Sequence, residues 1–378
     1  MARKLIKSLL FLITIFLFLS TISCTENASP VRVGAALVLT GPASYVGEEI
    51  RDGLIMAVEE INERGGINGR AIELVIEDAT APPPDGLSSS GNFLDPGKSA
   101  FDALEEKNPI VIVSSLSSLS IKLAPIAEKR KRLMVGLVAT APELTKTGDW
   151  VYRYWPTAEH EAPPLAELFE QLGHTTKGFG VIYLDDAYGT SVFRDLEKRC
   201  KAFGSKIVPA PFPLSGKKFS AEVELIKETS AVCVIGFDVH IINILKALRE
   251  IGYQGDIIST TTATLPSVTS IPEAENVYVT APAIYNKNFH FTDEIKNRYN
   301  QKFGKPFTQY SANGYDFIYI LSGILEDQPV TMDALKGMFE KGFVYSGVFG
   351  NIELKSGKKD ILFPIFPAQI INGNILFR

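Results

Sequence analysis

A run of hydroxyl side chains stands where an apolar segment gives way to a helical pattern. Five serines lie within residues 114–120, directly after the apolar segment 110–113. Hydroxyl and backbone N–H groups at such a strand-to-helix turn can cap the helix, or they can bind an anion at the positive end of the helix dipole. Capping uses one serine and leaves the others unexplained. The run therefore predicts an anion-binding turn.

Acidic and imidazole side chains form no recognisable catalytic or metal-binding pattern. The sequence contains no GxSxG, HExxH, GxGxxG or phosphate-loop motif, and its four histidines are scattered. Asp185 and Asp186 are adjacent acids of the kind that acid chemistry or a metal site uses. No partner motif accompanies them, so a solvent-facing loop is the simpler interpretation. We therefore expect no enzyme activity, no metal and no cofactor.

The elements that position these side chains are alternating strands and helices. Residues 31–39 form a near-continuous apolar run, as in a strand covered on both faces. After a Gly-Pro break come apolar residues at helical spacing and a second strand at 72–76. In such βαβ units ligands bind beyond the carboxyl ends of the strands. The loop 40–47 is therefore a first candidate site.

The alternation of strands and helices restarts after a polar–aromatic strand that ends near Pro156. The simplest interpretation is an α/β protein with two doubly wound parallel-sheet domains joined by a multi-strand hinge. Hinge crossings are expected near Pro156 and at residues 280–282. The first lobe is predicted to begin with residues 31–155, and the second lobe to contain residues 156–280 and 347–378.

Two late segments are predicted to finish the second lobe. Residues 347–352 and 363–371 have strand patterns and are expected to cross back to it. Asn372 and Gly373 predict a type I′ hairpin turn before a last short strand.

The first 23 residues have the three-part pattern of a secretory signal peptide. Arg3, Lys4 and Lys7 precede an apolar run at 9–19, and small and polar residues follow. That run is shorter than the roughly 20 residues of a membrane span, although an uncleaved anchor is the alternative. Cys24 ends this leader, and residues 24–30 would form a short tether.

Composition sets the broad class of the chain. Its 378 residues, 46% hydrophobic and 21% charged, allow two domains with a large core. The formal net charge is −5, and it becomes −8 once the three positive charges of the leader are subtracted. An acidic chain argues against a nucleic-acid partner. Cys200 and Cys233 are expected to be buried apolar groups rather than a disulfide.

Several motifs resemble the type I periplasmic binding proteins, and among them the leucine/isoleucine/valine-binding group of ABC transporters. The resemblance covers nearly the whole chain after the leader and is carried by TGPASYVG, AVEEINERGGINGR, ATAPELT, IKNRYNQKFGKP and QYSANGYDFIYILSGIL. It implies two lobes that close over a small ligand by hinge bending, with residues 281–346 returning to the first lobe. In addition, TISC resembles a bacterial lipoprotein cleavage box, with Thr21 where Leu is more usual. A match implies an acylated Cys24 that holds the exported protein at a membrane surface, and ordinary signal-peptide cleavage is the alternative.

The resemblance also implies ligand contacts at the first lobe. In the family the serine turn and the ATAPELT turn hold the α-carboxylate of an amino acid. The matching positions are Ser118 with Ser117 beside it, and Thr140 with the backbone of Ala139. Such charge-assisted hydrogen bonds are stronger than neutral ones. Tyr188 stands where the family places an aromatic ring against the ligand.

The ammonium end of the implied site departs from the family. The leucine-binding group has a Glu where this chain has Thr261. A buried ammonium group needs an acceptor, because an unpaired buried charge is costly. Asp238 is the nearest replacement carboxylate, although capping of the helix at 241–251 explains it equally well. Tyr45 is expected at the rim of the cleft.

Together these features predict an extracytoplasmic solute-binding lipoprotein of an ABC importer. It is expected to be a monomer, in the periplasm or at the cell surface, with a permease in the cytoplasmic membrane as its partner. The expected ligand is a branched-chain or similar amino acid. Because of Thr261, a non-amino organic or aromatic carboxylate is an alternative. A second alternative is a binding protein that presents its ligand to a signalling partner.

Overall fold

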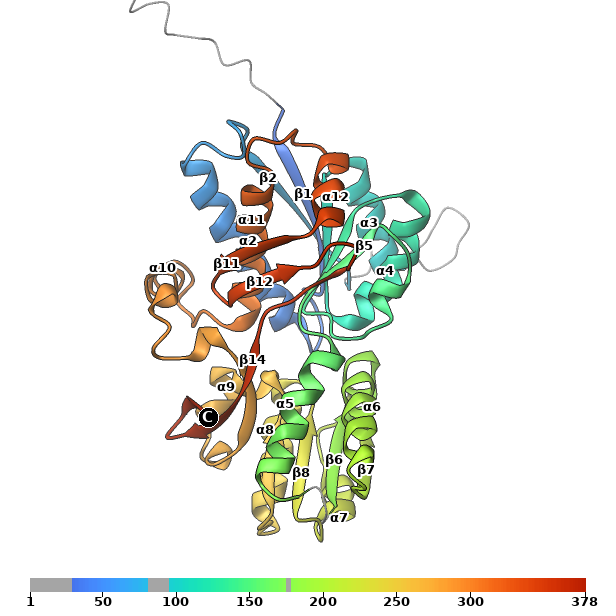
Figure 1. Cartoon of the computed structure of the whole chain (residues 1–378), viewed down its shortest axis with the longest axis vertical. Coiled ribbons are helices and arrows are strands. Elements are labelled where there is room, and N and C mark those ends of the chain that lie inside the picture. Colours follow the sequence, from blue (N-terminus) through green and yellow to red (C-terminus); the bar gives the residue numbers. More distant parts are fainter. Residues whose placement is uncertain (1–28, 81–94, 175–177) are drawn as a thin grey trace, which may run out of the picture. The chain divides into compact units, whose positions relative to one another are not determined.

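The computed structural model describes residues 29–80, 95–174 and 178–378. From residue 31 onward, strands alternate with helices, and most strands belong to two sheets (Figure 1). The predicted signal peptide and Cys24 lie outside the described residues. Within the described ranges, no helix combines the length and the apolar character that a membrane crossing requires.

The first sheet has six strands in the order β13-β5-β4-β3-β1-β2, and every neighbouring pair is parallel. The apolar run of β1 pairs with a neighbour on each side, so its side chains are almost all buried, as expected for a strand covered on both faces. The strands are β1 (Val31–Leu37), β2 (Ile72–Asp78), β3 (Val111–Ser115), β4 (Met134–Leu137), β5 (Val151–Tyr154) and β13 (Asp360–Ile361).

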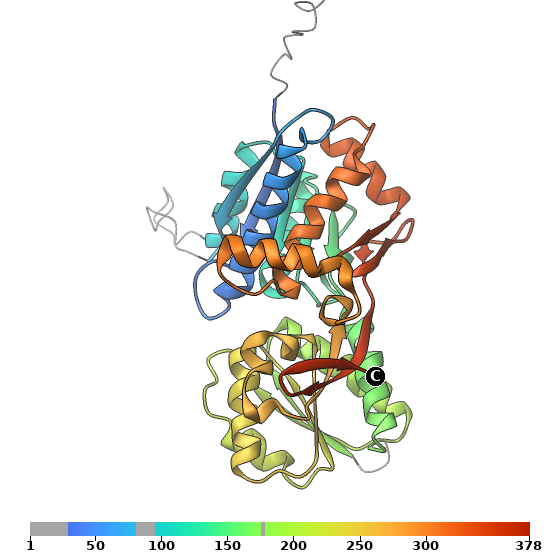
Figure 2. The same cartoon turned by 90° about the vertical axis from the view of Figure 1, so that its left-hand side faces the viewer.

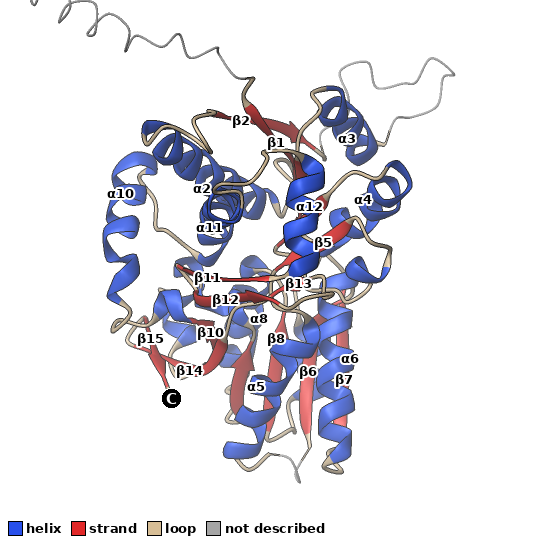
Figure 3. Ribbon diagram, turned by 45° about the horizontal axis from the view of Figure 1, so that its top comes forward, coloured by secondary structure: helices blue, strands red, loops and turns tan. Residues whose placement is uncertain are grey.

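Helices from two distant parts of the sequence accompany this sheet and complete the first lobe. They are α2 (Ser44–Glu63), α3 (Pro96–Glu106), α4 (Ser117–Arg130), η1 (Leu144–Lys146), α10 (Asp293–Phe303), α11 (Gln309–Ile324) and α12 (Met332–Lys341). Helices α2 and α11 lie side by side (Figure 3). A Cβ atom on Gly53 or on Gly314 would overlap the backbone of the other helix. The close packing of this pair therefore depends on glycine at both positions.

The second sheet has seven strands in the order β15-β14-β10-β9-β8-β6-β7. The five strands from β10 to β7 are parallel, and β14 and β15 add an antiparallel hairpin at one edge, drawn in red in Figure 2. The strands are β6 (Phe179–Leu184), β7 (Ile207–Phe212), β8 (Ala231–Ile235), β9 (Asp256–Ser259), β10 (Tyr278–Pro282), β14 (Ile365–Ile371) and β15 (Asn374–Phe377).

The helices of the second lobe follow its strands in the same βα order. They are α5 (Ala158–Gln171), α6 (Ala187–Ala202), α7 (Ser220–Ile226), α8 (Asp238–Glu250), η2 (Thr261–Thr264), α9 (Pro266–Thr269) and η3 (Pro272–Ala274), with η4 (Ala283–Tyr285) and η5 (His290–Thr292) leading back to the first lobe. The prediction of an α/β protein with two parallel-sheet domains is thus confirmed.

Residues 347–352 do not form a strand of the second lobe, and that prediction is wrong. They make the end of a separate antiparallel hairpin, labelled in Figure 3, whose strands are β11 (Phe343–Gly347) and β12 (Gly350–Leu354). The turn is fixed because the Val348 N–H donates to the Asp316 carboxylate at 2.9 Å, and because Gly350 takes a φ of 84°.

The return to the second sheet also comes later than predicted. β13 pairs with β5 in the first sheet, through Asp360 and Ile361. The Arg153 guanidinium, fully buried on β5, forms a 2.7 Å ion pair with Asp360, which explains why so short a strand stays there. The crossing therefore falls between Ile361 and Ile365, and the boundary predicted at residue 347 is corrected accordingly.

Two smaller predictions are confirmed. Cys200 and Cys233 are free, buried thiols. Asn372 and Gly373 both have positive φ, at 50° and 70°, and they join β14 to β15 as a type I′ turn requires.

Candidate functional site

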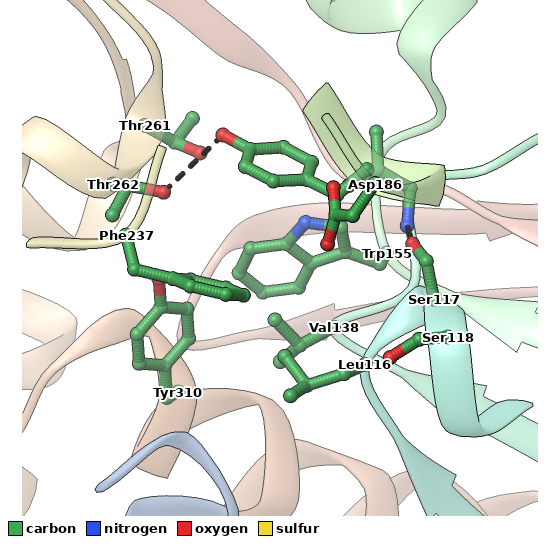
Figure 4. A pocket seen from close by; sticks show the side chains of 12 residues that line it. Leu116, Ser117, Ser118, Val138, Trp155, Asp186, Phe237, Thr261, Thr262 and Tyr310 are labelled. Carbon is green, nitrogen blue, oxygen red and sulfur yellow. Dashed lines mark hydrogen bonds between the residues drawn. The ribbon is translucent and has the colours of Figure 1, made fainter. Parts of the chain in front are cut away.

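Strand-end turns of both sheets line one pocket, hereafter the main pocket (Figure 4). The turns after β3, β4 and β5 contribute from the first sheet, and those after β6, β8 and β9 from the second, as expected for parallel α/β sheets. The lining residues are Leu116, Ser117, Ser118, Val138, Thr140, Trp155, Asp186, Tyr188, Phe237, Thr261, Thr262 and Tyr310.

Backbone strain marks the two first-lobe turns. Leu116, before α4, has φ = 62°, and Val138, after β4, has φ = 50°. Left-handed φ values are rare for residues other than glycine, and they are most unusual for a β-branched side chain. Such strain costs on the order of 1–3 kcal/mol per residue and is concentrated at functional sites. Both strained residues line the main pocket.

Ser117 joins these two turns through its hydroxyl group. Its Oγ accepts hydrogen bonds from the Thr140 N–H at 3.0 Å and from the Ala141 N–H at 3.2 Å. No described residue accepts the hydroxyl proton of Ser117, so that proton is available to a group in the pocket. Ser117 is also the first residue of α4, where the helix dipole favours a negative charge.

Ser118 and Thr140 add further hydroxyl groups to the same end of the pocket. Ser118 is exposed, whereas Thr140 is 2% exposed. The other serines of the run serve the fold. The Ser114 and Ser120 hydroxyls bond to each other at 2.8 Å, and the Ser115 Oγ accepts the Val38 N–H at 2.9 Å.

Ala139 lies behind the pocket wall. Its carbonyl, 3.2 Å away, and that of Ala141, 2.6 Å away, accept hydrogen bonds from the buried Arg153 guanidinium. The guanidinium also donates to the Thr145 hydroxyl at 3.0 Å. Arg153 therefore fixes the turn that carries Thr140. Sequence reasoning missed this arginine, which lies on β5 and carries no motif.

The second-lobe wall is aromatic and rich in hydroxyl groups. The Tyr188 hydroxyl lies 2.8 Å from the Thr260 Oγ1 and 3.4 Å from the Thr262 Oγ1. Its ring stacks on Phe237 with a centroid distance of 6.2 Å. Burial raises the pKa of Tyr188 well above its ordinary value, so the phenol stays neutral at physiological pH.

A buried acid holds the Thr261 turn. Glu161 is 1% exposed, and its Oε1 accepts the Thr261 N–H at 2.8 Å and the Thr280 hydroxyl at 3.2 Å. Burial raises the pKa of the Glu161 carboxyl. From the first lobe, the Gln309 side chain donates to the Thr261 carbonyl at 2.9 Å. Thr261 is therefore held from both lobes.

Trp155 and Tyr310 complete the aromatic lining. Their rings lie 6.0 Å apart, and Trp155 packs edge to face against Phe363 at 5.3 Å. Sequence reasoning placed neither ring in a site. Phe237 could have been found, because it lies in the turn after β8, whereas Tyr310 lies in an almost wholly buried helix whose pattern does not show which face is functional.

Five of the eight predicted ligand residues therefore line the main pocket, and Ala139, Tyr45 and Asp238 do not. Tyr45 and Asp238 border a second depression, hereafter the Glu49 hollow. There the Asp238 N–H donates to the Tyr45 hydroxyl at 3.5 Å. The residues of the Glu49 hollow are Tyr45, Glu49, Asp238, Leu265, Pro266, Ser267, Pro306 and Thr308.

The Asp238 carboxylate is turned away from the main pocket by its hydrogen bonds. Its Oδ2 accepts the Ser267 hydroxyl at 2.8 Å, and its Oδ1 accepts the Val239 N–H at 2.7 Å. Asp186 is instead the acid that reaches the main pocket. Burial raises the pKa of the Asp186 carboxyl. Among the described residues, no group of acids, histidines and cysteines could hold a metal ion.

The two parallel-sheet lobes and the pocket between their strand ends define a ligand-binding protein of the type I periplasmic class. A model of the periplasmic binding protein family matches residues 30–374, and the chain belongs to that family. Members of this family are extracytoplasmic substrate-binding proteins of ABC transporters rather than enzymes.

Sequence and structure comparisons agree with this assignment. The Leu/Ile/Val-binding protein homolog 7 of Brucella abortus (strain 2308) is 27% identical over 322 residues, which is 79% of this chain and 78% of the relative. A Streptococcus pneumoniae branched-chain amino acid binding protein in complex with isoleucine is 17% identical, with a TM-score of 0.78 over 92% of this chain and 97% of that one.

A similar fold also occurs with a different ligand. A solute-binding protein of Rhodopseudomonas palustris BisB5, in complex with 3,4-dihydroxybenzoic acid, is 19% identical, with a TM-score of 0.79 over 92% of this chain and 95% of that one. The fold alone therefore does not select the ligand.

Proposed function

We propose that the main pocket binds a small amino acid with an apolar side chain, branched-chain or similar, and that the chain delivers it to an ABC permease. The observation that carries this proposal is the composition of the pocket. Hydroxyl groups and a helix N-terminus stand at one end, and four aromatic rings stand around the remainder.

The two parts of the pocket suit the two parts of such a ligand. The carboxylate would accept hydrogen bonds from the hydroxyls of Ser117, Ser118 and Thr140 at the start of α4, where the helix dipole also favours it. The apolar side chain would pack against the rings of Trp155 and Tyr188. A dissociation constant between micromolar and nanomolar requires roughly 8 to 12 kcal/mol of net binding free energy.

A thermal-shift screen with calorimetry tests this proposal. Leucine, isoleucine, valine and phenylalanine are compared with other amino acids and with carboxylates that lack an amine. At 100 times the dissociation constant, a ligand stabilises the folded state by about 2.7 kcal/mol, which raises the melting temperature by several degrees. The amino-acid proposal fails if only the carboxylates without an amine produce a shift.

A double variant tests the carboxylate-binding end. Ser118→Ala with Thr140→Ala removes two of the proposed hydroxyl donors, and we expect at least tenfold weaker binding of the best amino acid. Ser215→Ala, at an exposed serine outside the main pocket, is the matched control. Unchanged affinity in the double variant would remove Ser118 and Thr140 from the site.

A non-amino organic or aromatic carboxylate is the second candidate ligand. It is favoured by Thr261 and Thr262, whose neutral hydroxyls line the second-lobe wall where the leucine-binding group has a Glu. The complex of the Rhodopseudomonas protein with dihydroxybenzoic acid gives this candidate further support. The same ligand screen separates the two classes.

We further propose that residues 1–23 are a signal peptide and that Cys24 is acylated, with residues 24–30 as a tether and the mature chain a monomer. The support is the basic–apolar–polar order of the leader and the TISC box. Expression of the full chain and of Cys24→Ser in a bacterial host, followed by membrane fractionation and mass spectrometry, tests it. A wild-type chain that is recovered without lipid contradicts the acylation proposal.

A further inference from the structure

One formally charged side chain lines the main pocket. Among its twelve described lining residues, Asp186 is the only acid, and there is no lysine, arginine or histidine. A ligand carboxylate in this pocket would therefore meet only hydroxyl and N–H donors, whereas a cationic group on the ligand would meet a carboxylate. This combination favours a ligand that carries both charges.

The Asp186 carboxylate is oriented by backbone groups and not by another side chain. It caps α6, with Oδ1 accepting the Gly189 N–H at 2.9 Å. No described side chain forms a hydrogen bond or an ion pair with it. Figure 4 shows the carboxylate pointing into the pocket, on the side of Trp155 and Ser117. A ligand cation could therefore approach it without displacing a protein partner.

We propose, on the basis of the proposed function, that Asp186 accepts the ammonium group of the amino-acid ligand. An α-amino acid carries its ammonium group on the carbon next to its carboxylate, so the receptors for the two groups must border the same end of the pocket. Asp186 and Ser117 both line the main pocket, and Figure 4 draws the Asp186 carboxylate on the side of Ser117. The neighbouring indole ring of Trp155 offers a face that also attracts cations.

Asp186 would thus replace an acceptor that this chain lacks at Thr261. The other acid suggested by the sequence, Asp238, is held in the Glu49 hollow by Ser267. Without Asp186, the ammonium group would have only neutral hydroxyl acceptors in a largely buried pocket, which costs several kcal/mol for an ion. The raised pKa of Asp186 agrees with a half-buried carboxylate that has no cationic partner among the described residues.

The same geometry makes Asp186 a specificity residue. A carboxylate ligand without an amine would place a second negative charge near Asp186 and leave it unpaired. Like charges brought together in a binding site cost several kcal/mol and reject the wrong ligand. The pocket should therefore discriminate against non-amino acids of the same shape.

The test combines a change in the protein with a change in the ligand. Calorimetry at pH 7.5 measures the binding of leucine and of 4-methylpentanoate, which is leucine without its amine, with phenylalanine and 3-phenylpropanoate as a second pair. The variant is Asp186→Asn, because Asn also caps helices. Asp186→Ser is a second neutral cap in case the first variant does not fold. Asp185→Asn is the matched control, since Asp185 is exposed and lies outside the pocket.

We expect Asp186→Asn to weaken the binding of the amino acid at least 30-fold, to strengthen that of its deaminated partner at least tenfold, and to melt near the wild-type temperature. Asp185→Asn should bind both ligands as the wild type does. Amino-acid affinity within threefold of wild type in Asp186→Asn would overturn the inference and leave the proposed function standing. Wild-type chain that binds only deaminated acids, or none of the four compounds, would overturn both.

Discussion

Tyr45 and Tyr188 occupy equivalent places in the two lobes. Each is the second residue of the helix that follows the first strand of its sheet, Tyr45 in α2 after β1 and Tyr188 in α6 after β6. The surroundings of the two rings differ. Tyr188 bonds to hydroxyl groups of its own lobe and faces the main pocket. Tyr45 accepts a hydrogen bond from Asp238 of the opposite lobe and borders the Glu49 hollow.

This difference shows that a shared architecture determines the backbone position of a side chain but not its contacts or its role. The second lobe uses the position to build a wall of the pocket, and the first lobe uses it for a contact between lobes. The same substitution at Tyr45 and at Tyr188 should therefore change ligand affinity by different amounts. Substitutions at equivalent packing positions of the two lobes should instead change stability by similar amounts.

The largest expected effect is on ligand affinity. Tyr188→Ala removes an aromatic wall and should weaken the binding of the best amino acid about 100-fold, because truncating a buried aromatic contact costs on the order of 3 kcal/mol. Tyr45→Ala should weaken it less than fivefold. Calorimetry on both variants measures the ratio. A greater loss in Tyr45→Ala would mean that the ligand occupies the Glu49 hollow instead.

Substitutions at the shared scaffold should act alike in both lobes. A Cβ atom on Gly47 would overlap the Val38 carbonyl oxygen, and one on Gly189 would overlap that of Leu184. Alanine normally improves a helix by about 1 kcal/mol over glycine, but overpacking costs 1–3 kcal/mol and should dominate here. We expect each Gly→Ala variant to melt roughly 4 °C lower than wild type.

Gly337 provides the matched control for these two variants. It lies inside α12 with no atom within 4 Å of an added Cβ, so Gly337→Ala should stabilise the chain slightly. Calorimetric melting curves of the three variants and of the wild type measure these differences in melting temperature. If Gly47→Ala or Gly189→Ala melts at or above the wild-type temperature, the close approach of helix to strand is not required.

The sequence predicted that Ser117 and Thr140 lie near one another because parallel strands present their carboxyl ends at one edge, and it placed Thr261 in the site only through the family resemblance. It pointed to Asp238 as the replacement carboxylate and interpreted Asp186 as part of a solvent-facing loop, although both acids follow a strand at the start of a helix. The deciding hydrogen bonds involve Gly189 in one case and the distant Ser267 in the other, and neither is visible in a local pattern.

Elements too short or too uniformly buried for a pattern were also missed. β13 has two residues, and its Asp360 is bound by Arg153, which lies 207 positions away in the sequence. Two residues are too few to show a strand periodicity. Tyr310 lies in a helix that is buried along most of its length, where apolar spacing cannot show which face meets the ligand. Long-range pairing and the choice of face are settled by tertiary packing, which a local window of sequence does not contain.

The Glu49 hollow should give the chain a pH-dependent stability that the main pocket does not explain. Burial raises the pKa of Glu49 from 4.5 to about 7, and the nearby acids Asp238 and Asp52 add to the rise while Lys305 and Thr308 oppose it. Between pH 4.5 and about pH 7, Glu49 is therefore protonated in the folded chain and ionised in the unfolded chain. The stability from this proton is complete below pH 4.5 and is lost as the pH rises through about 7.

Glu49→Gln tests this contribution, because the amide keeps an acceptor for the Thr308 hydroxyl. Melting temperatures at pH 5 and pH 8 should differ by about 2 °C less in the variant than in the wild type. The matched control is Glu48→Gln, outside the Glu49 hollow. An unchanged difference between the two pH values would show that Glu49 is ionised throughout this range.

The smallest expected effect concerns the hydroxyl groups of the two tyrosines. Tyr188→Phe removes the phenol hydroxyl that lies 2.8 Å from the Thr260 Oγ1 and 3.4 Å from the Thr262 Oγ1. This loss should lower the free energy of unfolding by about 1 kcal/mol. Tyr45→Phe removes only a 3.5 Å contact with the Asp238 N–H and should cost about 0.5 kcal/mol or less. Denaturant unfolding of both variants without ligand measures the pair. A cost at Tyr45 equal to that at Tyr188 would show that the contact between the lobes is as strong as the bonds within one.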